Sequence, residues 1–260
     1  MILSDPAVNV EAEKKRERCL GAFQFLKTLG ASRALQTKSE VEAAGVLVDY
    51  MGFPSHHDPQ KNWDSLKCLH HILEAAGDVD APILDAGSSR RSVILGWLDS
   101  LGYRSLYACD LRDKRRDYDK LSIKFSIQDL SQTNYADGFF QAVTCISVIE
   151  HGVSLENFAR EMSRILRVGG RLLVSTDFWS EPVDCRGIFP YGSLLPEMKI
   201  FQPKELNSFR ETAQRHGLAL IGGLDLSTRD RVIHWERVDR RFTFAFMAFE
   251  KVLPGGENRK

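Results

Sequence analysis

The middle of the chain alternates short apolar runs with longer segments of helical periodicity. Each run is rich in aliphatic or β-branched residues and has the length of a strand, and the segments between the runs are long enough for helices. Strands that alternate with helices indicate a parallel sheet with helices on both faces. We therefore expect an α/β fold with helices over residues 92–101 and 155–166. The predicted strands are PILDA, SLYACD, IKFSI, AVTCIS and GRLLVST.

The first part of the chain has a different pattern. Over residues 8–29 apolar residues recur at helical spacing, and the charged positions between them carry both signs. This predicts one or two amphipathic helices with a solvated outer face. Pro54 and Pro59 then interrupt regular structure. We expect residues 1–60 to form an N-terminal helical extension or lid.

The last part of the chain continues the alternation of helices and strands. Asn62 or Asp64 is suited to begin a helix that ends at Gly77, and another helix is expected over residues 203–216. The closing run RRFTFAFMAFEKV alternates phenylalanine with smaller residues, as a strand with two packed faces does. Residues 61–260 are therefore expected to form the main domain.

Composition narrows the classes of protein. The 260 residues contain 35 Lys plus Arg and 35 Asp plus Glu, so no overall field attracts nucleic acid or an anionic membrane. The 5 cysteines are scattered without a CxxC pair, which favours reduced thiols and disfavours a metal site. No segment reaches transmembrane length. The expected location is the cytoplasm.

The stretch ILDAGSSRR, residues 83–91, occupies the turn after the first predicted strand of the sheet. Ligands of open parallel sheets bind at such turns. A dinucleotide fingerprint would supply three glycines, whereas this turn has Gly87 alone, with Ser89 at the second glycine position. Asp85 would repel a diphosphate and attract an ammonium group. A dinucleotide-dependent oxidoreductase is therefore disfavoured.

Two further acids follow the next two strands. Asp110 lies 23 residues after Gly87, close to the usual offset of about 20 residues at which a carboxylate accepts hydrogen bonds from a ribose diol. Asp129 follows the third strand, where its carboxylate can accept from an exocyclic amine while Leu130 packs on the base. The pattern indicates a nucleoside-containing ligand.

Together, ILDAGSS, YACDL, FSIQDLSQTNYADGFFQAVTCISVIEHG, FAREMSRILRVGGRLLVSTD and FQPKELNSFRETAQRHGLALI resemble the class I S-adenosylmethionine-dependent methyltransferases, especially their small-molecule branch. The resemblance implies a Rossmann-like, doubly wound, seven-stranded sheet whose last strand is antiparallel. It implies methyl transfer from S-adenosylmethionine to a small molecule or biosynthetic intermediate. The cofactor-binding residues that it implies are Asp85, Gly87, Ser89, Asp110, Leu111, Asp129, Leu130 and Ser147.

The first motif departs from that family. The family pattern D-x-G-x-G-x-G is replaced by DAGSSRR. The hydroxyl of Ser89 can bond the cofactor carboxylate, but a positive φ at this position would cost about 1 kcal/mol. Arg90 either reaches an anionic group, such as the methionyl carboxylate, or points to solvent with Arg91.

His151, after the fourth strand of the main domain, is the candidate catalytic residue, because imidazole is suited to act as a general base near neutral pH. Alternatively, Glu150 and His151 only order their loop. His56 and His57, in PSHHDP, either fold over the pocket or form an ordinary exposed loop. Trp63 is expected to pack within its own domain rather than against the cofactor.

The segment DFWSEPVDCRGIFPYG follows the fifth strand and is the best candidate for acceptor binding. Trp179, Phe189 and Tyr191 can stack on an apolar or ring-shaped acceptor, or pin a long loop. Asp177 either binds a polar acceptor group or caps the following turn. The sequence does not identify the acceptor, and it leaves a homo-oligomer open.

Two alternative functions stay open. The altered glycine motif suits a noncatalytic methyltransferase-fold partner or scaffold that no longer holds a cofactor. The arginines of residues 228–241 suit an RNA methyltransferase, although acids alternate with them. Neutral net charge disfavours nucleic acid as a partner, and no membrane partner is expected.

Overall fold

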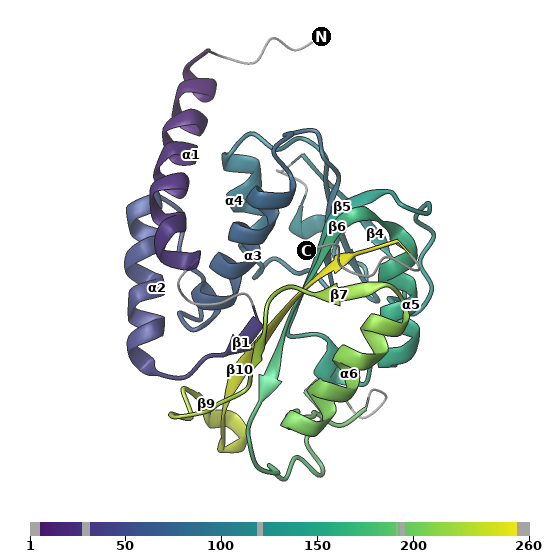
Figure 1. Cartoon of the computed structure of the whole chain (residues 1–260). Coiled ribbons are helices and arrows are strands. Elements are labelled where there is room, and N and C mark those ends of the chain that lie inside the picture. Colours follow the sequence, from purple (N-terminus) through teal and green to yellow (C-terminus); the bar gives the residue numbers. More distant parts are fainter. Residues whose placement is uncertain (1–5, 28–31, 119–121, 191, 193–195, 254–260) are drawn as a thin grey trace.

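The computed structural model describes residues 6–27, 32–118, 122–190, 192 and 196–253. A central sheet separates two groups of helices (Figure 1). Among the described residues, none of the helices is long and apolar enough to pass through a membrane. One face is covered by α3 (Lys61–Ala75) and α4 (Ile94–Ser100), with α1 (Pro6–Lys27) and α2 (Lys38–Met51) outside them, and the other by α5 (Leu155–Ile165) and α6 (Pro203–Arg215).

The described strands form a ten-stranded sheet in the order β4-β3-β2-β5-β6-β10-β1-β8, with β7 and β9 also paired to β10. β2 to β6 run parallel to one another, and β10 is antiparallel to β6. This confirms the predicted Rossmann-like sheet with an antiparallel last strand, but the described sheet has ten strands rather than the predicted seven because β1, β8 and β9 add to it. The strands are β1 (Ser32–Ala34), β2 (Ile83–Ala86), β3 (Leu106–Asp110), β4 (Ile123–Ile127), β5 (Phe140–Ile146), β6 (Leu166–Phe178), β7 (Leu218–Leu220), β8 (Leu224–Asp225), β9 (Ile233–Trp235) and β10 (Arg240–Lys251).

The core has two layers because the sheet is covered on both faces. β10 shows this directly: Phe244 and Phe246 pack in the cluster that contains α3 and α4 residues, whereas Ala245 and Met247 pack with α5 and α6 residues. Every residue from Phe242 to Phe249 is buried. The alternation read from the sequence is thus that of a strand with two apolar faces.

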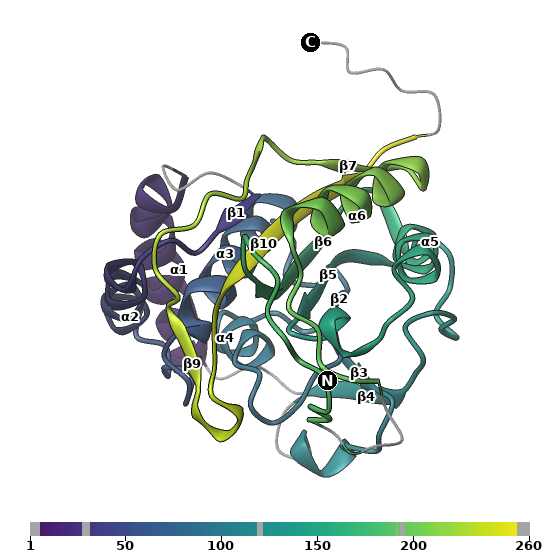
Figure 2. The same cartoon turned by 90° about the horizontal axis from the view of Figure 1, so that it is seen from below.

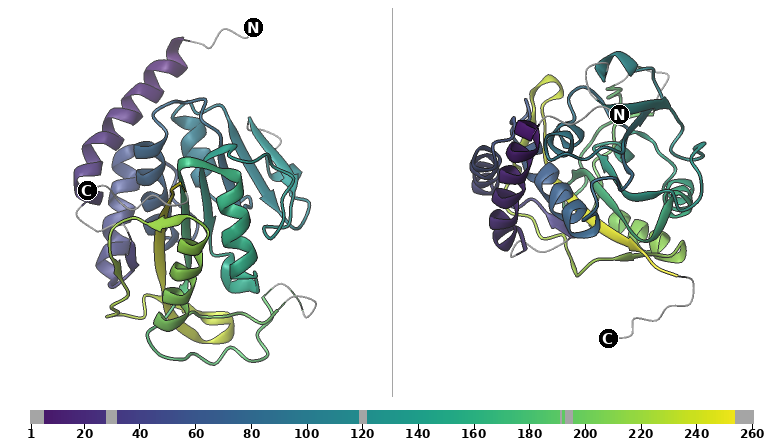
Figure 3. Two further views of the ribbon diagram at one scale, coloured as in Figure 1. Left: turned by 45° about the vertical axis from the view of Figure 1, so that its right-hand side comes forward. Right: turned by 90° about the horizontal axis from the view of Figure 1, so that it is seen from above.

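The N-terminal extension is part of this sheet. β1 pairs antiparallel with β10, placing Arg33 opposite Phe246, and β8 pairs parallel with β1. Figure 3 shows α1 and α2 side by side on one flank of the molecule. The helix expected over residues 8–29 corresponds to α1, with residues 28 and 29 outside the described residues. The sequence analysis did not anticipate α2, β1, β8 or β9.

The parallel strands all end at one edge of the sheet. In Figure 1 the arrowhead of β6 points down, so the view from below in Figure 2 faces this edge. The segments that leave β2, β3, β4 and β5 therefore meet there, as the ligand-binding edge of an open α/β sheet requires.

Candidate active site

A cavity of about 640 Å³ lies at this edge, within the size range of small-molecule sites. Its wall includes His56, His57, Asp58, Lys61 and Ser65 on one side and Pro196 on another, whereas no described residue of α1 or α2 lines it. Within the described part of the chain, no group of histidine, cysteine or acidic side chains is suited to hold a metal ion. The structure brings every predicted cofactor-binding residue and the predicted base to this one cavity: Asp85, Gly87, Ser89, Asp110, Leu111, Asp129, Leu130, Ser147 and His151.

Gly87 is held in a tight turn after β2. Its φ is +78°, and a Cβ atom there would lie 2.4 Å from Val148 Cγ2. The N–H groups of Gly87 and Ser88 both donate to the carbonyl oxygen of Cys109, at 2.9 Å. Ser89 is not among the described non-glycine residues with positive φ, so the strain considered for a serine at this position does not arise. Only the first glycine of the family motif is conformationally required here.

The carboxylate of Asp85 is bound by hydroxyl groups of its own domain. Thr144 Oγ1 donates to Oδ1 at 2.6 Å, and Ser92 and Ser88 donate to Oδ2 at 2.7 and 2.5 Å. Ser88 Oγ also lies 2.5 Å from the hydroxyl of Tyr118. Burial raises the pKa of Asp85, and the hydroxyl donors partly oppose that rise. Hydrogen bonds donated by hydroxyl groups thus fix the turn of the altered motif.

Asp110 and Asp129 follow β3 and β4. Asp110 accepts from the Arg112 N–H at 2.8 Å and from Lys114 Nζ at 2.6 Å. Asp129 accepts from the Ser131 N–H at 2.8 Å, beside the buried Leu130. A carboxylate has about four acceptor positions, so both acids retain capacity for ligand hydrogen bonds.

The two arginines of the turn have different positions. Arg90 is exposed, its backbone N–H donates to Asp117 Oδ2 at 3.1 Å, and it does not line the cavity. Arg91 is also exposed but lines the cavity beside Ser89. The sequence analysis singled out the first arginine as the candidate for an anionic group, whereas the structure brings the second to the cavity.

Sequence reasoning missed Lys61, which stands at the start of α3 on the cavity wall. Its ammonium donates to Ser147 Oγ and, at 3.2 Å, to Asp64 Oδ2, and it lies 3.4 Å from the centroid of the Phe244 ring. The side chain is 13% exposed and that of Asp64 is fully buried. Ser147 has a φ of +53°, which directs this contact from the end of β5. The signal was the Lys61–Asp64 pair in KNWD.

A group of buried acids surrounds this lysine. Ser175 Oγ donates to Asp64 Oδ2 at 2.8 Å, and Thr176 Oγ1 donates to Glu150 Oε2 at 2.9 Å. Burial alone would lower the pKa of Lys61, but Asp64, Asp177 and Glu150 outweigh it and raise this pKa. Burial, then the charge of Glu150, raises the pKa of Asp177 well above its usual value. The lysine therefore stays charged and compensates the acids.

His151 lies beyond β5, in the turn that follows Ser147. Burial lowers its pKa, and the charge of Lys61 lowers it further, whereas Glu150 acts in the opposite direction. A histidine with a lowered pKa is neutral at neutral pH and has a lone pair for a proton. This arrangement can supply a general base at the cavity wall.

His56 and His57 also line the cavity, so the loop PSHHDP contributes to the site. The His56 N–H donates to Asn62 Oδ1 at 2.8 Å, and the Asp58 N–H donates to His56 Nδ1 at 2.9 Å. Burial lowers the pKa of His56, as does its neighbour His57. Nδ1 of His56 also lies 3.0 Å from the carbonyl oxygen of Asp58, so the backbone of Asp58 holds the ring in place.

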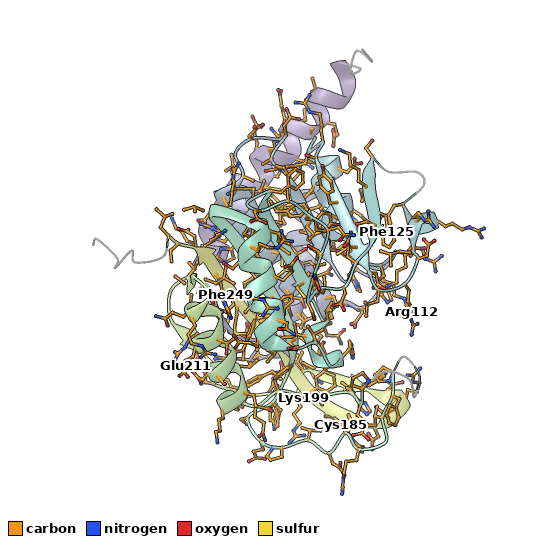
Figure 4. All side chains as sticks on the ribbon, turned by 90° about the vertical axis from the view of Figure 1, so that its right-hand side faces the viewer. Arg112, Phe125, Cys185, Lys199, Glu211 and Phe249 are labelled. Carbon is orange, nitrogen blue, oxygen red and sulfur yellow. The ribbon has the colours of Figure 1, made fainter. Side chains whose placement is uncertain are left out.

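The segment expected to bind the acceptor contributes mainly structure. Trp179 is buried under Arg231, whose Cζ lies 4.5 Å from the ring centroid. Phe189 is 39% exposed and lies off the cavity, and Tyr191 lies outside the described residues. Figure 4 labels Cys185, which is in this segment, and Lys199, which comes after it in the chain, both below Arg112 in that view.

Other expectations for this region have clear outcomes. Among the described residues of the range 179–201, Pro196 alone lines the cavity. It packs on the turn after His151, because a Cβ at Gly152 would lie 2.3 Å from Pro196 Cγ. Asp177 is buried and does not line the cavity. Trp63 is buried and packs edge-on against Phe246, with ring centroids 6.5 Å apart, as expected for packing within the domain.

Comparison with known structures supports the same fold. A geranyl diphosphate C-methyltransferase from Streptomyces coelicolor A3(2), solved with Mg²⁺, geranyl diphosphate and S-adenosyl-L-homocysteine, superposes with a TM-score of 0.52 at 19% identity over 77% of this chain and 85% of that one. A putative methyltransferase of Haloferax volcanii in complex with the Trm112 activator gives 0.54 at 13% identity over 84% and 97%. A Methanosarcina mazei S-adenosylmethionine-dependent methyltransferase gives 0.52 at 15% over 71% and 98%.

Sequence comparison agrees with the structural one. No curated protein sequence matches this chain. Residues 84–174 match the family described as a methyltransferase domain, and they contain β2 to β5 and most of β6, the strands that form the cavity edge. Residues 84–174 are therefore similar to a methyltransferase domain, and the chain shares the fold of these S-adenosylmethionine-dependent methyltransferases.

Proposed function

We propose that this protein is an S-adenosylmethionine-dependent methyltransferase that acts on a small-molecule acceptor. One observation carries the proposal: the residues suited to the base, the ribose and the amino-acid part of the cofactor, together with a neutral histidine, line one cavity. Asp129, Asp110 and Gly87 follow the adjacent strands β4, β3 and β2 in that order. Ser147 and His151 follow β5, the next strand of the sheet.

The cavity fits this cofactor. Gly87 can lie this close to Val148 only because glycine has no Cβ atom. Asp110 would accept from the ribose hydroxyls and Asp129 from the adenine amine, with Leu130 against the ring. When bound, S-adenosylmethionine supplies an electrophilic methyl group on a sulfonium centre. The altered motif is therefore compatible with cofactor binding at this cavity.

The protein's own part in the reaction is alignment, exclusion of water and removal of a proton. His151 is the proposed base, since its lowered pKa keeps the ring neutral. The Lys61 contact joins Ser147 to the start of α3, directly after the loop that carries His56. Pro196 covers the turn after His151. These residues would hold an acceptor against the base at a distance suited to proton transfer.

The size of the cavity and the positions of the basic residues favour a small acceptor over RNA. Arg231 packs over Trp179, and Arg240 Nε donates to the Asp184 carbonyl, so these two arginines are used within the protein. No residue of 228–241 lines the cavity among those described. The S. coelicolor enzyme, which shares the fold, has geranyl diphosphate in its structure, and the H. volcanii protein has an activator partner.

Isothermal titration with S-adenosylmethionine and S-adenosylhomocysteine tests the proposal. Wild-type protein should bind both, and Asp110→Ala should weaken binding by about 2 to 3 kcal/mol because the ribose loses a charged acceptor. Asp113→Ala is the matched control, since Asp113 is exposed and pairs with Arg115 off the cavity. A folded wild-type protein that binds neither compound would support the noncatalytic scaffold instead.

A further inference from the structure

The departure from the family's glycine motif leaves an arginine at the cavity. In DAGSSRR, Ser89 and Arg91 occupy the second and third glycine positions. Both line the cavity, and the Arg91 N–H donates to Ser89 Oγ at 3.3 Å. A serine and an arginine place a hydroxyl and a guanidinium where glycines offer only backbone. These side chains are suited to bind an anion.

The order of the strands indicates which part of the cofactor lies near this turn. With adenine at Asp129 after β4 and ribose at Asp110 after β3, the next strand end in the sheet is that of β2. The amino-acid part of the cofactor therefore lies along the turn formed by Gly87 to Arg91. That part carries a carboxylate, which requires a cation or several donors.

Besides Arg91, the cavity is lined by the basic residues Lys61, Lys114 and Arg112, and both lysines already have acidic partners. Lys61 pairs with Asp64 at 3.2 Å, and Lys114 pairs with Asp110 at 2.6 Å. The guanidinium of Arg91 forms no salt bridge with any residue that the structure describes, although it lines the same cavity. Asp85, the acid of this turn, is bound by hydroxyl groups and does not neutralise the arginine.

We propose that Arg91 binds the carboxylate of the cofactor's amino-acid part, replacing the close backbone approach that glycines allow in the family motif. This inference rests on the proposed function. The planar guanidinium can donate two parallel hydrogen bonds to a carboxylate, an interaction that lysine does not reproduce. Arg91 is thus a binding residue specific to the altered motif.

The chain supplies its own control in Arg90. This residue is adjacent in sequence, has the same side chain and is exposed, but it lies off the cavity. A general effect of removing one positive charge from the turn would appear in both Arg90→Gln and Arg91→Gln. A direct contact with the ligand would appear in Arg91→Gln alone.

Comparing two ligands separates the contribution of the carboxylate from that of the rest of the cofactor. S-adenosylhomocysteine carries the carboxylate, and 5′-(3-aminopropylthio)adenosine has the same adenosine, sulfur and ammonium without it. Calorimetric titration should show that Arg91→Gln weakens S-adenosylhomocysteine by about tenfold, an effect expected of an exposed charged hydrogen bond. The aminopropyl analogue should change by less than about twofold in the same variant. Arg90→Gln should leave both affinities within about twofold of wild type.

The outcomes separate the two proposals. Equal weakening of both ligands by Arg91→Gln, or no change in either, would overturn the carboxylate contact while leaving the methyltransferase proposal in place. Failure of folded wild-type protein to bind S-adenosylhomocysteine would remove the proposed function and this inference with it. Circular dichroism of each variant confirms folding, which substitution of an exposed arginine is expected to preserve.

Discussion

The two halves of the cavity are built in different ways. The cofactor half consists of residues at the ends of β2, β3 and β4 or just beyond them, each positioned by its strand. The acceptor half combines segments that are far apart in the chain and contains a buried group of charges. The cofactor half is defined by Asp85, Gly87, Asp110, Asp129 and Leu130, and the acceptor half by His56, Lys61, His151, Gly152 and Pro196. Ser147, an expected cofactor-binding residue, contacts Lys61 of the acceptor half.

This difference shows which part of the site depends on a local sequence motif. A strand followed by a tight turn is local, so its geometry survives replacement of two glycines as long as Gly87 keeps its positive φ. The acceptor half depends on contacts such as Lys61 to Ser147, which join residues 86 positions apart. The cofactor half is therefore sensitive to backbone changes, and the acceptor half to the balance of buried charge.

Lys61→Met should have the largest effect on stability. It removes the cation that compensates Asp64, Glu150 and Asp177 and leaves buried acids without it, which typically costs about 3 to 5 kcal/mol. Urea denaturation measures the free energy of unfolding. Lys204→Met, at an exposed lysine of α6, should change it by less than about 0.5 kcal/mol. A similarly small change for Lys61→Met would contradict the role given to this charge group.

Gly87→Ala tests the cofactor half. The left-handed backbone and the overlap with Val148 should together reduce stability by about 2 to 4 kcal/mol. Affinity for S-adenosylhomocysteine should fall by more than about tenfold, because the turn must shift. Gly45→Ala, where no atom lies within 4 Å of the new Cβ, is the control and should stabilise α2 by up to about 1 kcal/mol. Unchanged cofactor affinity in Gly87→Ala would remove the turn from the cofactor half.

Gly152→Ala makes the same chemical change in the acceptor half. Gly152 has a φ of +85° and faces Pro196, so the variant should lose about 1 to 3 kcal/mol of stability as the proline moves away. Calorimetry should show S-adenosylhomocysteine affinity within about twofold of wild type. Loss of this affinity, comparable to that of Gly87→Ala, would mean that the cavity does not divide into two halves as proposed.

The sequence predicted the cofactor half and the central sheet because both depend on local patterns. β2, β3, β4 and β5 lie where the apolar runs placed them, and each predicted acid or glycine follows its own strand. The helix α2 was missed although Val41, Ala44 and Val48 have helical spacing and Gly52, with a φ of +74°, ends it. Here a local signal for the helix is present in the sequence.

The remaining differences have a non-local cause. β1 is a strand of three residues that is stabilised by pairing with β10, more than 200 positions later, and no local pattern reports such a pairing. The Lys61 contacts and the packing of Pro196 on Gly152 depend on the same long-range folding. Arg91 rather than Arg90 reaches the cavity because of the path of the backbone in the turn. Two adjacent arginines in the sequence do not indicate which of them lines the cavity.

The smallest expected effect is a shift in the pKa of His151, which tests the role of this one residue in the acceptor half. Its pKa is lowered from the usual 6.5, first by burial and then by Lys61, so its NMR titration midpoint should lie below 6.5. Glu150→Gln should lower the midpoint further, because Glu150 raises the pKa. The NMR signal of His151 is identified by its absence from the spectrum of the His151→Gln variant.

The sign of this shift links the histidine to both folding and catalysis. A folded-state pKa below 6.5 means that the unfolded chain binds the proton more readily, so this residue's contribution to stability is present above 6.5 and is lost as the pH falls through the lowered value. The same neutral ring is what a base requires at neutral pH, so the acid limb of methyl transfer should also lie below 6.5. A midpoint above 6.5 would instead leave much of the ring protonated at neutral pH, and His151 would then be a residue that orders the acceptor half and takes no proton.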